Sequence, residues 1–475
     1  MSNSKHWSAK ERIEYLLDEN SFVEIGALVT RRNTDFNLSS NEVPADGVIT
    51  GYGVIDCNPV YVYSQDVSAL NGTIGEMHAK KIANLYDMAI KVGAPVIGIL
   101  DCGGLRLQEA TDALAGLGSI YTKQIEASGV IPQITAVVGN CGGGEALVSA
   151  LSDFTYMLKD DAKLYVNAPN TLEGNHSSKK DTAAADFQAE VGNVDFVCEN
   201  EEELFSSIRE LVTFIPTNNE DDASYDECTD DLNRFNDVNG TKDALKILEG
   251  ISDDGRVIEV KADYAKSMVT AFIRLNGMTV GAVANRSEIV TEEGTKELET
   301  TMTANGCYKA ERFVKICDAF NIPILTLTAT TGFRNTVCGE KRVAISASRM
   351  MYAFGEATVP KINVIIGNSY GSAYVAMNSK HIGADMVFAW PNTEISTMEA
   401  DMAAKIMYAD EKDVNVINEK ADEYRNLQAS TESAAKRGYV DAIINPEVTR
   451  KNLIYAYEML FTKREDRISK KHGTV

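Results

Sequence analysis

Short apolar runs alternate with amphipathic stretches along most of the chain. Apolar runs of the kind that form buried strands occupy residues 47–55, 59–63, 96–100 and 134–138. Apolar side chains at helical spacing occupy residues 9–18 and 77–92, and helices are expected over 107–117 and from about 145. This order of strand, turn and helix predicts an α/β fold with a buried sheet.

The same pattern occurs twice in the chain. Residues 95–106 and residues 323–334 each combine a proline, an apolar run and a glycine-containing turn that ends in arginine, and the second copy begins 228 positions after the first. The same offset links Lys81 to Lys309 and residues 132–140 to residues 360–368. Several segments that keep one offset predict a duplicated domain.

Residues 216–231 are acidic and poor in large apolar side chains, which predicts a linker between the copies. An acidic interaction loop is the alternative. We therefore expect domains at 1–231 and 232–475. The second pattern begins near Asp243 and runs to about residue 400. A charged, exposed helix or loop is expected at 411–428 and a closing helix near 453–461.

Composition excludes several classes of function. The formal net charge of −23 argues against binding of nucleic acid or an anionic membrane through the overall field. Eight cysteines without a C-x-x-C pair and five histidines without H-x-x-x-H spacing argue against a metal site. The polar N-terminus and the absence of an apolar run of about 18–20 residues predict reduced thiols and a cytoplasmic location.

The clearest local signal for chemistry is the glycine-rich turn predicted at residues 139–144. Three consecutive glycines allow close approach of a ligand, and the first amides of the following helix have no internal acceptor. Two such amides can bind a thioester oxygen and stabilise it as an enolate. A close strand–helix contact would also need glycine. The small residues at 371–374, at the equivalent place of the second copy, favour two oxyanion holes.

Charged side chains near the turns are weaker candidates. Arg106, Arg334, Lys80 and Lys81 are placed to meet phosphate, although a salt bridge is the more ordinary role for each alone. Glu145, directly after the glycine run, is either an acid/base or a carboxylate favoured at a helix start, and the second interpretation is preferred.

Nearly the whole chain resembles the β-type carboxyltransferase subunits of biotin-dependent acyl-CoA carboxylases. Their close relatives include propionyl-CoA carboxylases and the α subunits of sodium-pumping methylmalonyl-CoA decarboxylases. The stretches that carry the resemblance, in the family's order, are residues 12–24, 46–53, 91–98, 313–324, 356–361 and 434–441.

The resemblance implies two tandem crotonase-like domains, each a ββα spiral, and assembly as a hexamer. It implies that the amides of Gly143 and Gly144 hold the acyl-CoA thioester oxygen on the N-terminal side. The amides of Ser372 and Ala373 would hold the ureido oxygen of biotin on the C-terminal side. The residues implied to lie near the acyl-CoA substrate are Gly72, Gly103, Gly104, Leu105, Arg106 and Val375.

The implied reaction uses no protein nucleophile and no metal. Biotin carries the carboxyl group, and an enolate of a short-chain acyl-CoA, most simply propionyl-CoA, gains or loses it. The sequence lacks an Ala-Met-Lys-Met motif, so biotin is expected on a separate carrier chain or domain. Expected partners are a biotin carboxyl carrier with a biotin carboxylase, or with membrane decarboxylase subunits.

Departures from the family cluster near the biotin side. Residues 329–333 read Ala-Thr-Thr-Gly-Phe in place of Asp-Val-Pro-Gly-Phe, and residues 367–374 lack a basic pair and have Ser372 in place of glycine. Val375 replaces a frequent aspartate, which bears on acyl preference. The usual Gly-Gly-x-x-x-His segment is absent from residues 182–193. Two alternatives remain: a crotonase-type hydratase, isomerase or hydrolase using Glu145 without biotin, and a non-catalytic paralogue.

Overall fold

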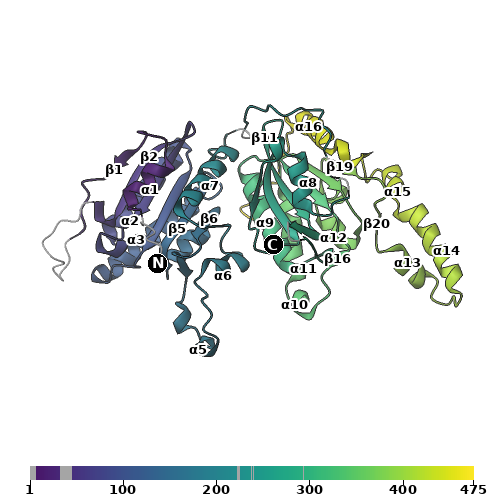
Figure 1. The fold of residues 1–475 in the computed structure, drawn as a ribbon, viewed down its shortest axis with the longest axis horizontal. Coiled ribbons are helices and arrows are strands. Elements are labelled where there is room, and N and C mark those ends of the chain that lie inside the picture. Colours follow the sequence, from purple (N-terminus) through teal and green to yellow (C-terminus); the bar gives the residue numbers. More distant parts are fainter. Residues whose placement is uncertain (1–6, 33–44, 222–224, 237, 239, 292–293) are drawn as a thin grey trace. The chain divides into compact units, whose positions relative to one another are not determined.

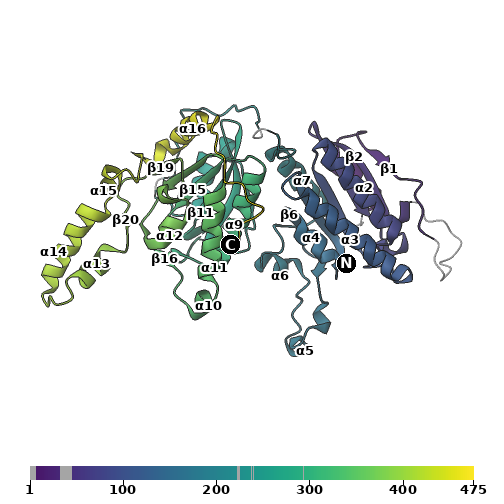
Figure 2. The same ribbon diagram turned by 180° about the vertical axis from the view of Figure 1, so that it is seen from behind.

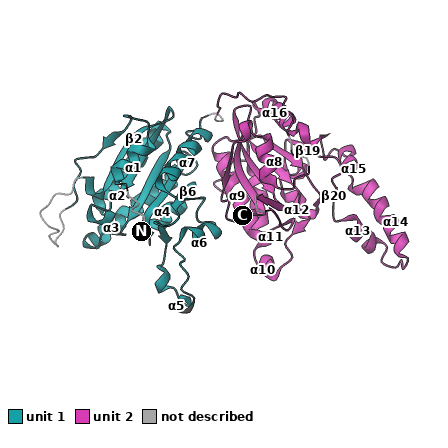
Figure 3. Cartoon of the chain, viewed as in Figure 1, with its two compact units in different colours: residues 1–222 teal, residues 223–475 magenta. Residues whose placement is uncertain are grey.

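The computed structural model describes residues 7–32, 45–221, 225–236, 238, 240–291 and 294–475. The chain divides into two compact units, residues 1–222 and residues 223–475 (Figure 3). Each unit is built on one mixed sheet that is mostly parallel. The division falls inside the acidic segment 216–231.

Unit 1 contains a sheet in the order β1-β2-β3-β4-β5-β6-β8, with β7 also paired to β5 (Figures 1 and 2). Its pairs are antiparallel from β1 to β3 and parallel beyond. The strands are β1 (Val23–Ile25), β2 (Val48–Ile55), β3 (Asn58–Gln65), β4 (Val96–Cys102), β5 (Gln133–Gly142), β6 (Phe154–Leu158), β7 (Lys163–Tyr165) and β8 (Phe196–Cys198). The helices are α1 (Ala9–Leu16), α2 (Glu76–Val92), α3 (Ala110–Ala127), α4 (Glu145–Leu151), α5 (Asn175–Ser178), α6 (Ala185–Glu190) and α7 (Glu201–Phe214).

Unit 2 repeats this plan in the order β9-β10-β11-β15-β17-β19-β21. The strands of its main sheet are β9 (Val257–Val260), β10 (Met268–Leu275), β11 (Met278–Asn285), β15 (Ile324–Thr328), β17 (Lys361–Ile365), β19 (Met386–Ala389) and β21 (Ala442–Ile443). Its small pairs are β12 (Glu288–Thr291) with β13 (Gly294–Glu297), β14 (Thr301–Met302) with β16 (Gly332–Phe333), and β18 (Ser369–Tyr370) with β20 (Ile395–Ser396). The helices are α8 (Ala244–Ile251), α9 (Ala304–Ala319), α10 (Val337–Glu340), α11 (Val343–Glu356), α12 (Gly371–Ala376), α13 (Ala400–Met407), α14 (Val414–Tyr424), α15 (Thr431–Lys436) and α16 (Thr449–Leu460).

The two sheets share their strand register as well as their order. Val96 pairs with Gln133 between β4 and β5, and Ile324 pairs with Lys361 between β15 and β17. Both members of the second pair lie 228 positions after those of the first. The duplication predicted from the sequence is therefore present in the backbone hydrogen bonds of both units.

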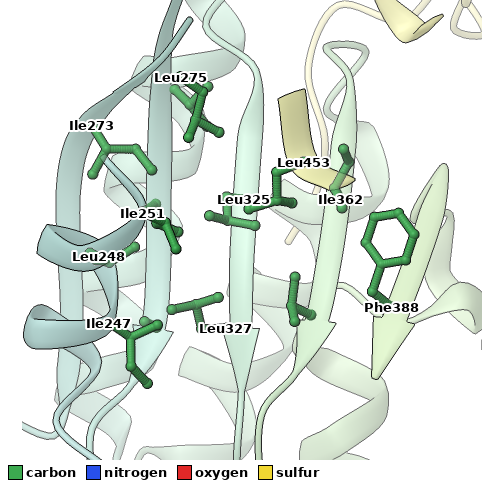
Figure 4. Close-up of a cluster of buried hydrophobic side chains, with 14 of the residues drawn as sticks. Ile247, Leu248, Ile251, Ile273, Leu275, Leu325, Leu327, Ile362, Phe388 and Leu453 are labelled. Atoms are coloured by element: carbon green, nitrogen blue, oxygen red, sulfur yellow. The ribbon is translucent and has the colours of Figure 1, made fainter. Parts of the chain in front are cut away.

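The core of unit 2 explains why its sequence forms these layers. Strands β10 and β11 are buried along their whole length, as expected for a sheet that is covered on both faces. Apolar side chains of α8 and α16 pack on one face of the sheet (Figure 4). Each fully buried Leu, Ile or Phe contributes roughly 1.5–3 kcal/mol. Labelled examples are Ile247, Leu248, Ile251, Leu325, Leu327, Ile362 and Leu453.

Both ends of the acidic segment are held by hydrogen bonds or ion pairs. The amide of Asn219 donates to the carbonyl oxygen of Val130 at 3.0 Å in unit 1. Asp230 forms an ion pair with Arg234 at 2.8 Å in unit 2. The chain divides into its two units within this segment, as expected of a linker, and each end of the segment bonds to its own unit.

Candidate active site

The carboxyl ends of β4 and β5 carry the two glycine turns of unit 1. Cys102 pairs with Cys141 in the sheet, so the residues that follow the two strands start side by side. The side-chain amide of Asn140 donates to the carbonyl oxygen of Cys102 at 2.9 Å and joins the strand ends. The turn at 103–106 and the turn at 143–144 therefore share one edge of the sheet.

The turn after β5 is shorter than the sequence predicted. Strand β5 continues through Gly142, which leaves Gly143 and Gly144 as the turn. Gly143 has φ +66° with open space around it, so it is needed for its backbone conformation. Gly144 is needed for space, because a Cβ there would lie 2.6 Å from the Leu117 side chain and 2.9 Å from the Tyr121 hydroxyl.

The backbone groups of this turn are fixed by neighbouring strands and helices. The Gly143 amide donates to the carbonyl oxygen of Tyr165 at 2.8 Å. The Tyr121 hydroxyl donates to the carbonyl oxygen of Gly144 at 2.7 Å. Helix α4 begins at Glu145, so the Gly144 amide lies where amides lack an intrahelical acceptor. Of the predicted pair, the Gly143 amide is engaged within the protein, whereas the Gly144 amide is at the start of α4.

Residues 71–74 close over the turn that follows β4. At Gly72 a Cβ would lie 2.5 Å from the carbonyl oxygen of Asp101, so the two segments touch. Three backbone bonds join them: Gly103 N to Asn71 O at 2.8 Å, Ile74 N to Gly104 O at 3.0 Å and Arg106 N to Ile74 O at 2.8 Å. Ile74 also forms a bridge with Leu105. The structure thus brings together Gly72 and the residues 103–106 that were selected from sequence.

Unit 2 forms the equivalent turn at Gly371. Its φ of +63° matches the +66° of Gly143, 228 positions earlier. Ser372 and Ala373 lie in the first turn of α12, and Ser372 is exposed. Because the left-handed conformation falls on Gly371, the serine at 372 keeps an ordinary φ. A serine at 372 is therefore compatible with the turn without left-handed backbone strain.

A pocket of about 320 Å³ lies at the same edge of the unit 2 sheet. Its lining includes Ala329, Thr331, Gly367, Asn368, Asn285 and Lys242. In unit 1 the position equivalent to Ala329 is Asp101. Its carboxylate accepts from the backbone amide of Asn140 at 3.3 Å and lies 3.5 Å from the Arg12 guanidinium. A charged side chain therefore stands in unit 1 where unit 2 has a methyl group.

Comparison with known proteins agrees with this geometry. The sequence matches the carboxyl transferase domain over residues 6–475. It is 39% identical to the methylmalonyl-CoA decarboxylase subunit alpha of Veillonella parvula over 482 residues, covering 98% of this chain and 92% of the relative. It is 38% identical to the propionyl-CoA carboxylase beta chain of Roseobacter denitrificans, covering 98% and 93%.

The fold has a close match among solved structures. The transcarboxylase 12S structure, described as a hexamer assembly with methylmalonyl-coenzyme A and methylmalonic acid bound, superposes with a TM-score of 0.92 at 36% identity. The match covers 98% of this chain and 92% of that chain. The chain belongs to the carboxyl transferase family. It is therefore a carboxyltransferase enzyme with two tandem crotonase-like units, as the sequence predicted.

Two cations proposed as phosphate contacts have structural roles in this carboxyltransferase. The Arg106 side chain is 1% exposed, and its guanidinium lies 2.8 Å from both Asp46 and Glu109. The ammonium group of Lys81 is buried and donates to the carbonyl oxygens of Ala45, at 3.0 Å, and Val48. Arg106 therefore has the ion-pair role that the sequence favoured over phosphate binding, and the donors of both side chains are used inside unit 1.

The other two cations remain exposed. Lys80 lies on the surface of α2 beside a pocket of about 190 Å³. The Arg334 side chain is 47% exposed and forms an ion pair with Glu299 at 3.1 Å. Val375, proposed to influence acyl choice, is half-buried and packs against a hydrophobic cluster that includes Tyr374. Val375 lies in α12 of unit 2, shortly after the turn at Gly371.

Glu145 starts α4, as the preferred interpretation from the sequence expected, but its burial and its partner were not expected. The side chain is 3% exposed, and its carboxylate accepts from the side-chain amide of Gln65 at 2.8 Å. Burial raises the pKa of Glu145 to about 7, against the effect of the Gln65 hydrogen bond. Gln65 was not among the candidate site residues chosen from the sequence. Its only sequence signal is a polar side chain at the end of a buried strand.

Within the described ranges, no cluster of three or more His, Cys, Asp or Glu side chains is placed to hold a metal ion. None of the described helices combines the length and apolarity needed to cross a bilayer.

Proposed function

We propose that the chain moves a carboxyl group between biotin and the α-carbon of a short-chain acyl-CoA, with propionyl-CoA and methylmalonyl-CoA as the substrate pair. The main support is similarity along nearly the whole chain to proteins named for these compounds, together with glycine turns at equivalent positions of both units. The proposal also assigns unit 1 to the acyl-CoA side and unit 2 to the biotin side.

In unit 1 the proposed ligand of the turn at 143–144 is the thioester oxygen. The Gly144 amide is the principal donor, because the Gly143 amide already donates to Tyr165. Removal of the α-proton or loss of the carboxyl group turns the thioester into an enolate, and the donor then faces a full negative charge. A preorganised donor of this kind contributes roughly 3–4 kcal/mol to the transition state. Gly72 and the turn 103–106 would contact the CoA moiety alongside.

In unit 2 the residues fit the head group of biotin. Biotin, when bound, supplies the atom that carries the carboxyl group. The amides of Ser372 and Ala373 lie in the first turn of α12, where a ureido oxygen would find donors. The adjoining pocket offers hydroxyl and amide groups from Thr331, Asn285 and Asn368 for a polar ring. The chain would orient the head group and exclude water from it.

The proposed assembly follows from the relatives. Biotin would arrive on a separate carrier chain, with a biotin carboxylase or membrane decarboxylase subunits as further partners and a cytoplasmic location. A hexamer is proposed from the named assembly of transcarboxylase 12S. The same residues would serve both addition and removal of the carboxyl group. The similarity to decarboxylase alpha subunits supports decarboxylation as the second candidate.

The proposal is tested with the purified chain, free biotin and, separately, methylmalonyl-, malonyl- and glutaconyl-CoA. Mass spectrometry follows loss of the carboxyl group with and without biotin. Biotin-dependent loss from methylmalonyl-CoA is the expected result. Turnover without any biotin dependence would favour a crotonase-type reaction. Failure with every ester, in a folded protein that still binds CoA, would favour a non-catalytic paralogue.

Two variants at Ser372 test the proposed amide donor of unit 2. Ser372→Pro deletes one amide at a helix position that tolerates proline, and Ser372→Ala removes only the hydroxyl. The difference between the two variants measures the amide, and we expect roughly a 10²–10³-fold loss of turnover for the proline variant. Equal turnover in both variants would remove Ser372 from the proposed hole.

A further inference from the structure

The buried carboxyl of Glu145 stands directly behind the glycine turn of unit 1. The residue follows Gly144 and starts α4, yet its side chain is 3% exposed. One carboxyl oxygen accepts from Gln65 at 2.8 Å. The other, Oε2, is buried with no hydrogen-bond partner within the described part of the chain. An ionised carboxylate is costly to bury with one oxygen unpaired, so this arrangement favours the neutral acid.

Gln65 connects Glu145 to the second turn. While its side-chain amide donates to Glu145, its side-chain oxygen accepts from the backbone amide of Asp101 at 3.0 Å. Asp101 lies near the end of β4, just before the turn 103–106. One side chain thus joins the start of α4 to the end of β4. The contact fixes the separation of the two turns that share this edge.

The groups that face Glu145 are uncharged near neutral pH. They are Tyr63 on β3, Cys102 on β4, Tyr121 on α3 and Cys141 on β5. Burial raises the pKa of all four, and the charge of Glu145 adds to each shift. Within this set Glu145 is the group that titrates near pH 7. A change in its charge is therefore felt directly by the turn and is not neutralised by these neighbours.

We propose that Glu145 is a positioning residue whose neutral carboxyl, held by Gln65, keeps the two turns of unit 1 in place, and that its ionisation suppresses turnover. The inference rests on the proposed function, because it assumes that negative charge develops on an oxygen held by the turn at 143–144. A carboxylate immediately behind that turn repels the developing charge, whereas the neutral acid does not.

The test compares pH profiles of biotin-dependent decarboxylation of methylmalonyl-CoA for the wild-type chain and Glu145→Gln. The glutamine keeps an acceptor for Gln65 and cannot ionise. We expect wild-type kcat to fall about tenfold per pH unit above about 7, as for loss of one required proton. The variant should lack this fall. Parallel profiles would overturn the proposal.

A second variant gives the direction of the shift. Gln65→Met removes the donor that lowers the pKa of Glu145, so the fall in kcat should move to higher pH. A move to lower pH, or none, would contradict the link between the two residues. A loss beyond about 100-fold at every pH in folded Glu145→Gln would also overturn it, because the carboxyl would then exchange a proton with substrate itself.

Infrared difference spectroscopy separates this inference from the proposed function. The neutral acid should give a carboxylic C=O band in the wild-type chain that disappears as the pH rises through about 7 and is absent from Glu145→Gln. The band needs no substrate, so it is measurable even if no ester is turned over. Absence of the band would overturn the inference even in an active carboxyltransferase.

Discussion

The two units share one backbone plan but use equivalent side chains differently. The backbone amide of Arg106 donates to the carbonyl oxygen of Ile74 at 2.8 Å, and that of Arg334 donates to the carbonyl oxygen of Met302 at 2.9 Å. Arg334 and Met302 lie 228 positions after Arg106 and Ile74. The Arg106 guanidinium is buried between two carboxylates, whereas the Arg334 side chain is half exposed. Duplication has kept the hydrogen-bond framework while the role of the side chain diverged.

The same difference recurs at the ends of the central strands. Asp101 and Glu145 of unit 1 correspond to Ala329 and Ala373 of unit 2. Unit 1 therefore surrounds its turn with titratable groups, and unit 2 has methyl groups and a pocket at the equivalent edge. We infer that the turn geometry is the common requirement and that the surrounding charges adapt each unit to a different reactant.

The largest expected contrast is between Arg106→Met and Arg334→Met. Removing Arg106 leaves Asp46 and Glu109 buried without their cation, which should destabilise unit 1 by about 3–5 kcal/mol. The exposed pair of Arg334 should be worth about 0–1 kcal/mol to unit 2. The measurement is denaturant unfolding followed by tryptophan fluorescence.

The chain offers one tryptophan per unit for this experiment. Trp7 stacks on Phe205 in unit 1, and Trp390 donates to the Thr449 hydroxyl in unit 2. Trp390→Phe and Trp7→Phe backgrounds thus report each unit separately. A similar loss from both arginine variants would break the comparison, since it would mean that burial does not distinguish the two sites.

The arginine pair also shows what the sequence can and cannot predict. Apolar periodicity and glycine spacing are local signals, and they located α2, β4, β5 and the offset of 228 correctly. The partners of Arg106 and Glu145 come from distant segments, Asp46 and Gln65, which no local pattern points to. Burial of a charged residue depends on such partners, so the sequence could name candidate roles for Arg106 and Glu145 but not their burial.

A pH-dependent contrast is next in size. With its pKa raised from 4.5 to about 7, Glu145 contributes stability that is complete below pH 4.5 and is lost as the pH rises through about 7. The total is roughly 3 kcal/mol at about 1.4 kcal/mol per unit. Glu145→Gln should remove this dependence from the Trp7 transition, while Ala373 leaves unit 2 without it.

The control for this effect lies in the same unit. Burial lowers the pKa of His78 from 6.5 to about 3, so it contributes stability that is complete above pH 6.5 and is lost as the pH falls to about 3. The wild-type chain and the Glu145→Gln variant share this opposite pH dependence of stability. It therefore cancels when the unfolding free energy of one is subtracted from that of the other. An unchanged pH dependence in the variant would show that Glu145 is already ionised in the folded state.

Substitution of the two buried lysines should destabilise the two units equally, unlike substitution of the two arginines. Lys309 donates to the carbonyl oxygens of Lys261 at 2.7 Å and Tyr264 at 3.0 Å, as Lys81 does to its own pair. Lys81→Met and Lys309→Met each leave these carbonyls short of a donor. We expect each variant to lower the free energy of unfolding of its own unit by about 1–3 kcal/mol, as reported by the tryptophan of that unit. A loss of stability in only one unit would mean that the lysine–carbonyl hydrogen bonds do not contribute equally in the two units.

The smallest expected effects concern the two left-handed glycines. Gly143→Ala should destabilise unit 1 by roughly 1–2 kcal/mol through backbone conformation alone, because nothing lies within 4 Å of the new methyl group. Gly371→Ala carries the same conformational cost and adds a 3.3 Å approach to the carbonyl oxygen of Thr397, so its loss should be slightly larger. Ser372→Gly is the matched control with an ordinary φ, and should change stability by about 0.5 kcal/mol or less. If Ser372→Gly stabilised unit 2 as strongly as Gly371→Ala destabilised it, the strain of the turn would lie on the serine. The equivalence of Gly143 and Gly371, on which the comparison of the two units depends, would then be wrong at this turn.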